Sequence, residues 1–171
     1  MPKKSDNLYE ETIPIFIRFL GNLSTILDKG NRFAKRKKGR VSEKKLLEGR
    51  LAPDMYTFIQ QIGYAYFMAL ETACNLTGKE MPVFTYDEKS VKELQTSLRR
   101  SIAFLRTIKP RDIASTRGKR MKTFLDPTER FSREMYVRTL ALPNFFFHVT
   151  TAYDIFRHLG VPLKKDDYLG V

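Results

Sequence analysis

Apolar side chains recur every three to four residues through four long segments of this chain, and this spacing constrains the fold more than any other feature. Residues at such intervals share one face of a helix, so each segment predicts an amphipathic helix with one buried side. The four predicted helices begin near Ile13, Pro53, Asp87 and Ser132. The apolar pattern of the first runs from Ile13 to Leu27, and Gly30 and Gly39 weaken its basic continuation; the other three end near Gly78, Pro110 and Gly160. Because strand patterns are scarce, the sequence predicts an all-α fold.

Proline and capping residues define the predicted boundaries more closely. Pro14 lies either in the first turn of the first helix or in a kink of a longer helix that begins near Asn7. Ser42 predicts the N-cap of a short additional helix that ends at Leu47. Pro143 interrupts the last helix, and the sequence leaves open whether the helix breaks or only bends there.

A long, charged connection separates the third and fourth predicted helices. It covers residues 109–131, where Met121, Phe124 and Leu125 precede a turn at Asp126 and Pro127 and suit a short β-hairpin. Four long helices with one long connection predict a four-helix bundle. With 171 residues, the chain suits one hydrophobic core, so we expect a single domain over residues 1–171.

Composition narrows the cellular setting. No uncharged apolar run reaches the roughly 18 residues that a membrane helix needs, and the polar start does not resemble a signal peptide, so we expect a cytoplasmic protein without a membrane span. The single cysteine, Cys74, lies in an apolar run, which favours a buried thiol over a nucleophile.

Four sequence blocks carry a resemblance to a known family. They are residues 9–16 (YEETIPIF), 50–55 (RLAPDM), 142–148 (LPNFFFH) and 166–170 (DDYLG). Together they look like an uncharacterised bacterial family within the DinB/YfiT-like superfamily, and the match covers nearly the whole chain. The resemblance implies a four-helix bundle that is often dimeric.

The better-known members of that superfamily hold a divalent metal with three histidines, and they include thiol-dependent transferases, isomerases and hydrolases. One histidine comes from the second helix and two come from a His-x-x-x-His pair in the last helix. By resemblance, these positions fall on Gln60 or Gln61, Asn144 and His148 of this chain. One imidazole with neutral amides makes a poor zinc site, so no cofactor is expected, and whether the protein is an enzyme stays open.

Helical spacing defines a candidate pocket around the remaining histidine. Asn144 and His148 are four residues apart, and Asp54 and Gln61 are seven apart, so each pair shares a helix face. His158 lies about 15 Å from His148 along a helix with a rise of about 1.5 Å per residue, too far to share a ligand. The alternative roles are structural: a hydrogen-bonded core histidine at 148, a helix-start carboxylate at 54 and a surface amide at 61.

Positive charge is the second functional signal. The chain has 31 Lys and Arg against 19 Asp and Glu, a net charge of +12, and Arg36, Lys37, Lys38 and Arg40 form the densest basic patch. Such a patch can attract nucleic acid or an acidic surface. No zinc-finger spacing or RNA-recognition motif accompanies it, so a solvated helix end is the competing interpretation.

Three functional hypotheses follow from these observations. The first is a DinB-like helical-bundle protein, homodimeric, with a small-ligand pocket near His148 and no established catalysis. The second is a degenerate DinB-like transferase or hydrolase that holds a divalent metal through His148. The third is a basic module that binds nucleic acid or an acidic surface.

Overall fold

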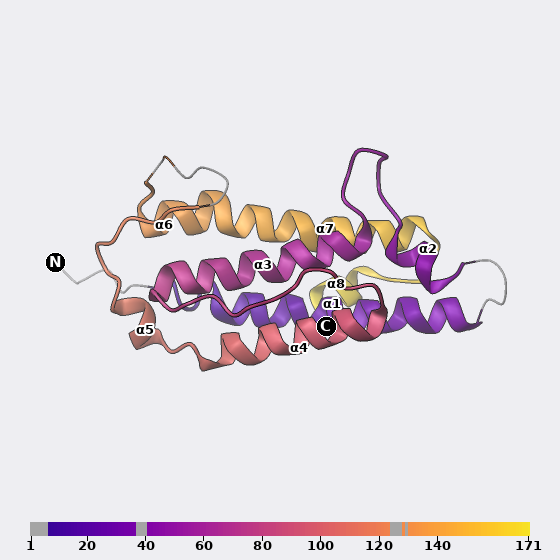
Figure 1. Ribbon diagram of the computed structural model, residues 1–171, viewed down its shortest axis with the longest axis horizontal. Helices are drawn as coiled ribbons and strands as arrows, with labels where there is room; N and C mark the ends of the chain where they lie inside the picture. Colours follow the sequence, from indigo (N-terminus) through magenta and orange to yellow (C-terminus); the bar gives the residue numbers. More distant parts are fainter. Residues whose placement is uncertain (1–6, 37–40, 124–127, 129) are drawn as a thin grey trace.

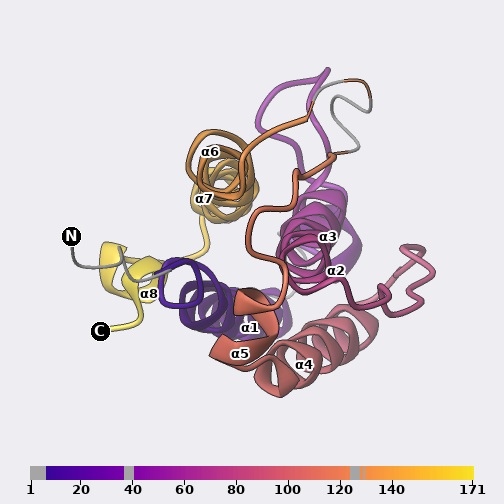
Figure 2. The ribbon, with the colours of Figure 1, turned by 90° about the vertical axis from the view of Figure 1, so that its left-hand side faces the viewer.

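Four long helices form the body of the protein (Figures 1 and 2). The computed structural model describes residues 7–36, 41–123, 128 and 130–171. The long helices are α1 (Ile13–Arg36), α3 (Phe58–Thr77), α4 (Val91–Thr107) and α7 (Leu142–His158). The short ones are α2 (Glu43–Leu47), α5 (Pro110–Ala114), α6 (Arg133–Met135) and α8 (Lys165–Leu169), with a π-helical segment, η1 (Tyr136–Ala141), before α7. The predicted all-α bundle is confirmed.

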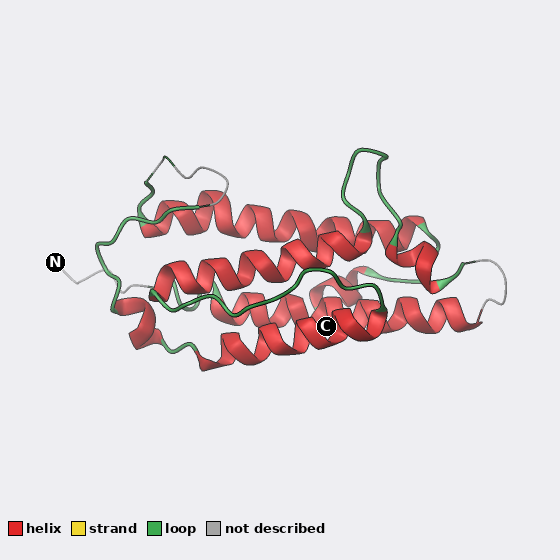
Figure 3. Cartoon of the chain, in the orientation of Figure 1, coloured by secondary structure: helices red, strands yellow, loops and turns green. Residues whose placement is uncertain are grey.

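The long helices pack mainly in two pairs, α1 with α4 and α3 with α7. In Figure 1, α1 and α7 run in one direction while α3 and α4 run in the other. Because α3 and α4 are parallel, the chain after α3 must return along the bundle before α4 begins, and Figure 3 shows this return as a loop lying over the helices. Residues 79–89 form that return segment.

The N-terminal boundaries of two helices differ from the predictions. We predicted that the second long helix opens at Pro53, but α3 begins at Phe58, and Thr57 caps it through a reciprocal contact with Gln60. We predicted Asp87 as the cap of the third, but Ser90 caps α4 by accepting a hydrogen bond from the backbone of Glu93. In both cases, the hydroxyl of a residue closer to the helix, Thr57 or Ser90, caps it in place of the predicted start at Pro53 or Asp87.

Other predicted boundaries hold. Ser42 caps α2, Pro14 lies in the first turn of α1, and Gly78 ends α3 with a φ of 72°, a left-handed conformation that suits glycine. Ser132 starts α6 by accepting a hydrogen bond from the backbone of Met135.

Pro143 neither breaks the last helix nor stops it. Helical structure continues from α6 through η1 into α7, and the backbone N–H of Leu142 bonds to the carbonyl of Val137, five residues back. Proline lacks an N–H group and crowds the carbonyl four residues before it. The wider π turn takes up this crowding just ahead of the proline, so the helix continues.

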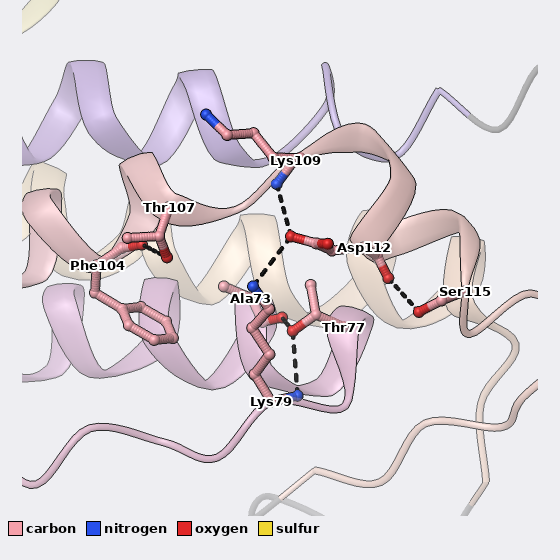
Figure 4. Close-up of polar contacts among 8 residues, drawn as sticks. All are labelled: Ala73, Thr77, Lys79, Phe104, Thr107, Lys109, Asp112 and Ser115. Carbon is pink, nitrogen blue, oxygen red and sulfur yellow. Dashed lines mark hydrogen bonds and ion pairs between the residues drawn. The ribbon is translucent and has the colours of Figure 1, made fainter.

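The predicted long connection between the third and fourth long helices is confirmed. Near its start, α5 is fixed to the end of α3, because Asp112 Oδ2 lies 3.1 Å from Lys79 Nζ and accepts a hydrogen bond from the backbone of Lys109 at 3.0 Å (Figure 4). The backbone hydrogen bond and then Lys79 lower the pKa of the Asp112 carboxyl.

The hairpin predicted for this connection is smaller than expected where the structure describes it. Within residues 119–123 and 130–131, one antiparallel bridge joins Met121 and Phe131 through two backbone hydrogen bonds. Phe124, Leu125, Asp126 and Pro127 lie outside the described residues. Of the helices described, none is long and apolar enough to cross a membrane.

Candidate functional site

His148 of α7 and Gln61 of α3 form a buried polar pair between the two helices. The imidazole Nδ1 lies 2.6 Å from Gln61 Oε1, and the side chains are 5% and 1% exposed. The amide nitrogen of Gln61 donates to the backbone carbonyl of Tyr56 at 3.5 Å, which turns its oxygen toward the imidazole. A carbonyl oxygen can only accept, so Nδ1 carries the hydrogen and donates it.

Burial keeps this imidazole neutral. It lowers the pKa of His148 to about 4, because the charged form would lose its hydration. With Nδ1 protonated, Nε2 of the neutral ring carries the lone pair, and no hydrogen bond to it occurs within the described part of the chain. The site therefore presents one uncharged acceptor, held in a fixed tautomer by Gln61.

Aromatic rings surround the histidine. Tyr64 stacks on the imidazole with ring centres 5.1 Å apart and an interplanar angle of 17°, and Phe147 meets it edge-on at 5.4 Å. Tyr56 in turn stacks on Tyr64 at 4.6 Å, and the two hydroxyls lie 3.1 Å apart. We call Tyr56, Tyr64, Phe147 and His148 the aromatic stack. Tyr64 was not among the predicted site residues, although its position three residues after Gln61 places it on a neighbouring part of the same helix face.

The other two candidate pocket residues lie apart from the His148–Gln61 pair. The amide nitrogen of Asn144 is 3.2 Å from the sulfur of Met68, which is about two turns along α3 from Gln61. Asp54 is exposed in a turn before α3, so the prediction that it lies in the first turn of that helix is wrong. His158 is at the end of α7 and exposed.

These side chains do not fit the metal that the DinB resemblance implies. The Gln61 oxygen is already the acceptor for His148, and the Asn144 amide faces a thioether, so His148 Nε2 is the single strong donor at the site. Zinc sites need three or four imidazole, thiolate or carboxylate ligands. Within the described residues, no group of three or more His, Cys, Asp or Glu side chains is placed to hold a metal ion.

A cavity of about 600 Å³ opens on the neighbouring face of α3. Helix α3 contributes Ile59, Gln60, Gly63, Tyr64 and Phe67 to its lining, and residues 86–89 of the return segment form the opposite side. Tyr64 therefore belongs both to the cavity and to the aromatic stack, whereas His148, Gln61, Asn144 and Asp54 do not line the cavity. Its volume lies within the range of about 300–1,000 Å³ that is common for small-molecule sites.

Gly63 deepens this cavity. A Cβ built at this position meets no heavy atom of another segment within 4 Å, although the residue itself is buried. Glycine within a helix costs about 0.5–1 kcal/mol relative to alanine. Neither packing nor a turn requires glycine here, so its effect on the structure is to leave space.

The far side of the cavity is built around two tyrosines. Tyr86 adopts a left-handed backbone conformation, with a φ of 55°, and its ring stacks on Tyr66 at 5.3 Å. Tyr66 donates a hydrogen bond to Glu88 Oε1 at 2.7 Å, and Ser97 of α4 donates to the same oxygen. Burial, followed by the nearby charge of the Glu88 carboxylate, raises the pKa of Tyr86 to about 12.

The predicted basic patch is only partly described. Arg36 lies in the last turn of α1, where it lines an open hollow of about 590 Å³ together with Lys29 and Arg32. Lys37, Lys38 and Arg40 lie outside the described residues. Lys29 is paired with Asp167 of α8, which offsets part of the charge around this hollow.

Cys74 shows no sign of activation. Its sulfur lies 3.6 Å from the backbone carbonyl of Glu80, and burial, followed by the charge of Glu71, raises the pKa of the thiol to about 11. A thiol with a raised pKa is a weak nucleophile at neutral pH, which agrees with the structural interpretation of this residue.

Comparison with known proteins identifies the family. A family model described as a domain of unknown function, DUF1993, matches residues 8–169. The chain is also similar to a DinB family member protein from Shewanella denitrificans, whose crystal structure has a TM-score of 0.89 and 32% sequence identity, with 96% of this chain and 92% of that chain covered. No curated protein matches the chain. The chain therefore belongs to the DUF1993 family and has the fold of the DinB-like superfamily.

Proposed function

We propose that this protein is a homodimeric helical-bundle protein that binds a small molecule in the α3 cavity beside the aromatic stack. The observation that carries this proposal is the cavity itself: about 600 Å³ of space lined by apolar and aromatic side chains with a few polar groups. Small-molecule sites typically combine these features. The proposal places the pocket near His148, one aromatic ring away, rather than on the imidazole.

In this proposal, the His148–Gln61 pair supports the wall of the cavity. Tyr64 lines the cavity and stacks on His148, and Gln61 fixes the orientation of that imidazole. Because the pair is buried and uncharged at neutral pH, it holds Tyr64 without placing a charge beside an apolar ligand. His148 is then a positioning residue for Tyr64.

Gly63→Leu provides the test of ligand binding. We expect a screen of soluble fragments, followed by backbone amide NMR shifts, to find compounds that perturb residues 59–67 and 86–89 of the unmodified protein. The leucine side chain would occupy the cavity, so the same compounds should lose these shifts in the variant. The matched control is Gly21→Leu in α1, where an added Cβ also meets nothing within 4 Å and which does not line the α3 cavity. A screen without hits at these residues, or hits that persist in Gly63→Leu, would contradict the proposal.

The proposed dimer rests on exposed apolar side chains near the aromatic stack. Phe147 is 53% exposed and Tyr56 is 43% exposed, and Leu51, also 43% exposed, precedes Tyr56 in the same projecting turn. Exposed aromatic side chains close to one another are typical of protein interfaces. A second copy of this chain, in contact through this face, would cover them.

Phe147→Asp is expected to convert the dimer to a monomer, because a carboxylate would be buried without a partner at the interface. Light scattering coupled to size-exclusion chromatography measures the mass directly. Met135→Asp is the matched control, since Met135 is also 53% exposed but lies on α6. A monomeric unmodified protein, or a Phe147→Asp variant that remains dimeric, would refute this part of the proposal.

A further inference from the structure

The α3 cavity combines aromatic walls with two carboxylates. Tyr64 and Phe67 line it from α3, and Tyr86, Asp87 and Glu88 line it from the return segment. No ion pair of Asp87 or Glu88 within 4.0 Å occurs in the described parts of the chain. Although the chain has a net charge of +12, two carboxylates from adjacent residues therefore lie beside this one cavity.

Two cations on and near the return segment, Arg100 and Lys89, are engaged elsewhere or exposed. The Arg100 guanidinium lies 4.7 Å from the centre of the Phe84 ring and donates to the backbone carbonyl of Val83 at 3.2 Å. Lys89 is exposed, and its backbone N–H donates to Glu93 at 2.6 Å. With Lys89 included, the charged residues of the lining still sum to one negative charge, from Asp87, Glu88 and Lys89.

Glu88 is held in a defined position at this site. Its Oε1 accepts hydrogen bonds from Tyr66 of α3 and Ser97 of α4, so the carboxylate is anchored from both helices. Both hydrogen bonds go to Oε1, and no hydrogen bond to Oε2 occurs among the described residues. Two hydroxyl donors stabilise a carboxylate but do not neutralise it, so its charge remains available to a ligand.

The rings add a second attraction for positive charge. Tyr86 stacks on Tyr66 and meets Phe67 edge-on at 5.8 Å, so the tyrosine is held over α3 despite its left-handed backbone. The faces of tyrosine and phenylalanine rings attract cations, and such attraction grows when the cation loses water. Aromatic rings also accept an apolar body, which the 600 Å³ volume can hold.

We infer that the cavity binds an organic monocation, an amine or quaternary ammonium group carried on an apolar body. The ammonium group lies at Asp87 and Glu88, and the apolar body lies between Tyr64, Phe67 and Tyr86. This inference rests on the proposed small-molecule function and adds the chemical class of the ligand. A neutral ligand would leave the negative charges of both carboxylates uncompensated, and an anionic ligand would be repelled by them.

Three probes of nearly equal size test the charge preference: 2-phenylethylamine, which is a cation at pH 7, 2-phenylethanol, which is neutral, and phenylacetate, which is an anion. Titration calorimetry and backbone amide NMR shifts at constant ionic strength give the dissociation constants. We expect the cation to bind about tenfold more tightly than the alcohol, and phenylacetate to bind more weakly still. Glu88→Gln keeps an acceptor for Tyr66 and Ser97 and should remove most of this preference, as should Asp87→Asn.

The outcomes separate this inference from the proposed function. If all three probes bind equally and Gly63→Leu abolishes binding of all three, the cavity is a ligand site but the preference for cations is refuted. If 2-phenylethylamine binds equally to the unmodified protein and to Gly63→Leu, both proposals fail. A tenfold preference that survives in both Glu88→Gln and Asp87→Asn would overturn the assignment of the ammonium position.

Discussion

Gly30→Ala is expected to lower the free energy of unfolding by about 2–3 kcal/mol, although alanine is the better helix former. A Cβ at Gly30 would lie 2.1 Å from Cε2 of Phe156, where α1 meets α7. The Phe156 ring cannot easily move, because it is buried and stacked on Phe58 with ring centres 3.6 Å apart. Either the ring leaves that stack or the two helices separate. Urea denaturation monitored by circular dichroism measures the loss.

Gly21→Ala is the control for this effect. Gly21 lies in the same helix, and its added Cβ would meet nothing within 4 Å, so the substitution should raise stability by about 0.5–1 kcal/mol. In a Phe156→Leu background, Gly30→Ala should lower the free energy of unfolding by less than it does in the unmodified protein, because the smaller side chain leaves room for the methyl group. If both glycine variants change stability in the same direction, the close contact between Gly30 and Phe156 does not govern this packing.

Gly30 also shows why helix periodicity predicted the bundle better than its boundaries. Glycine destabilises a helix, so Gly30 weakened the predicted continuation of the first helix, but α1 continues to Arg36. The glycine is required by an aromatic ring of α7 that lies more than a hundred residues later in the chain. Local propensity cannot express such a requirement, whereas the apolar stripe of each helix depends on nearby residues alone.

Pro143 also shows that a local sequence signal is not enough to predict where a helix ends. Its lack of an N–H group predicts a disturbance of the helix, and a disturbance is present, but η1 absorbs it and α7 continues. Whether a proline ends a helix depends on whether burial of the following turns offsets the free energy lost with the missing backbone hydrogen bond. Here Phe145, Val149 and Ala152 are buried after the proline, which favours continuation.

One part of the candidate site was predictable, namely the pair of side chains that face each other across the second and last long helices. The family resemblance placed Gln60 or Gln61 of the second long helix opposite His148 of the last, and the structure brings Gln61 into contact with His148. The predicted position of Asp54 is wrong because α3 begins at Phe58 rather than at Pro53. Asn144 contacts the sulfur of Met68, and the spacing of residues in the sequence does not indicate this contact. The cavity was not predictable, because it depends on where the return segment crosses α3, a nonlocal feature of the fold.

His148→Ala is expected to lower the free energy of unfolding by about 2–3 kcal/mol. The substitution leaves the buried Gln61 oxygen without a donor, removes a ring that contacts Tyr64 and Phe147, and leaves a void between α3 and α7. His158→Ala is the matched control: that side chain is exposed at the end of the same helix, so its loss should change stability by less than about 0.5 kcal/mol. Thermal and urea denaturation at pH 7 give both values, and equal stability of the two variants would contradict a buried structural role for His148.

A double-mutant cycle separates the hydrogen bond from the packing. Gln61→Leu leaves the imidazole Nδ1–H unpaired, whereas His148→Phe/Gln61→Leu removes both polar partners and keeps their volume. The double variant should therefore be more stable, by about 1 kcal/mol, than the sum of the two single effects predicts.

The pH dependence of stability provides an independent measurement. The pKa of His148 falls to about 4 on folding, so the unfolded chain binds more protons than the folded chain between pH 4 and pH 6.5. The stability contributed by the neutral imidazole is therefore complete above pH 6.5 and is lost as the pH falls through this window. His148→Phe should therefore flatten the stability curve between pH 6.5 and pH 4, whereas a curve that stays parallel to that of the unmodified protein would show that another group causes the dependence.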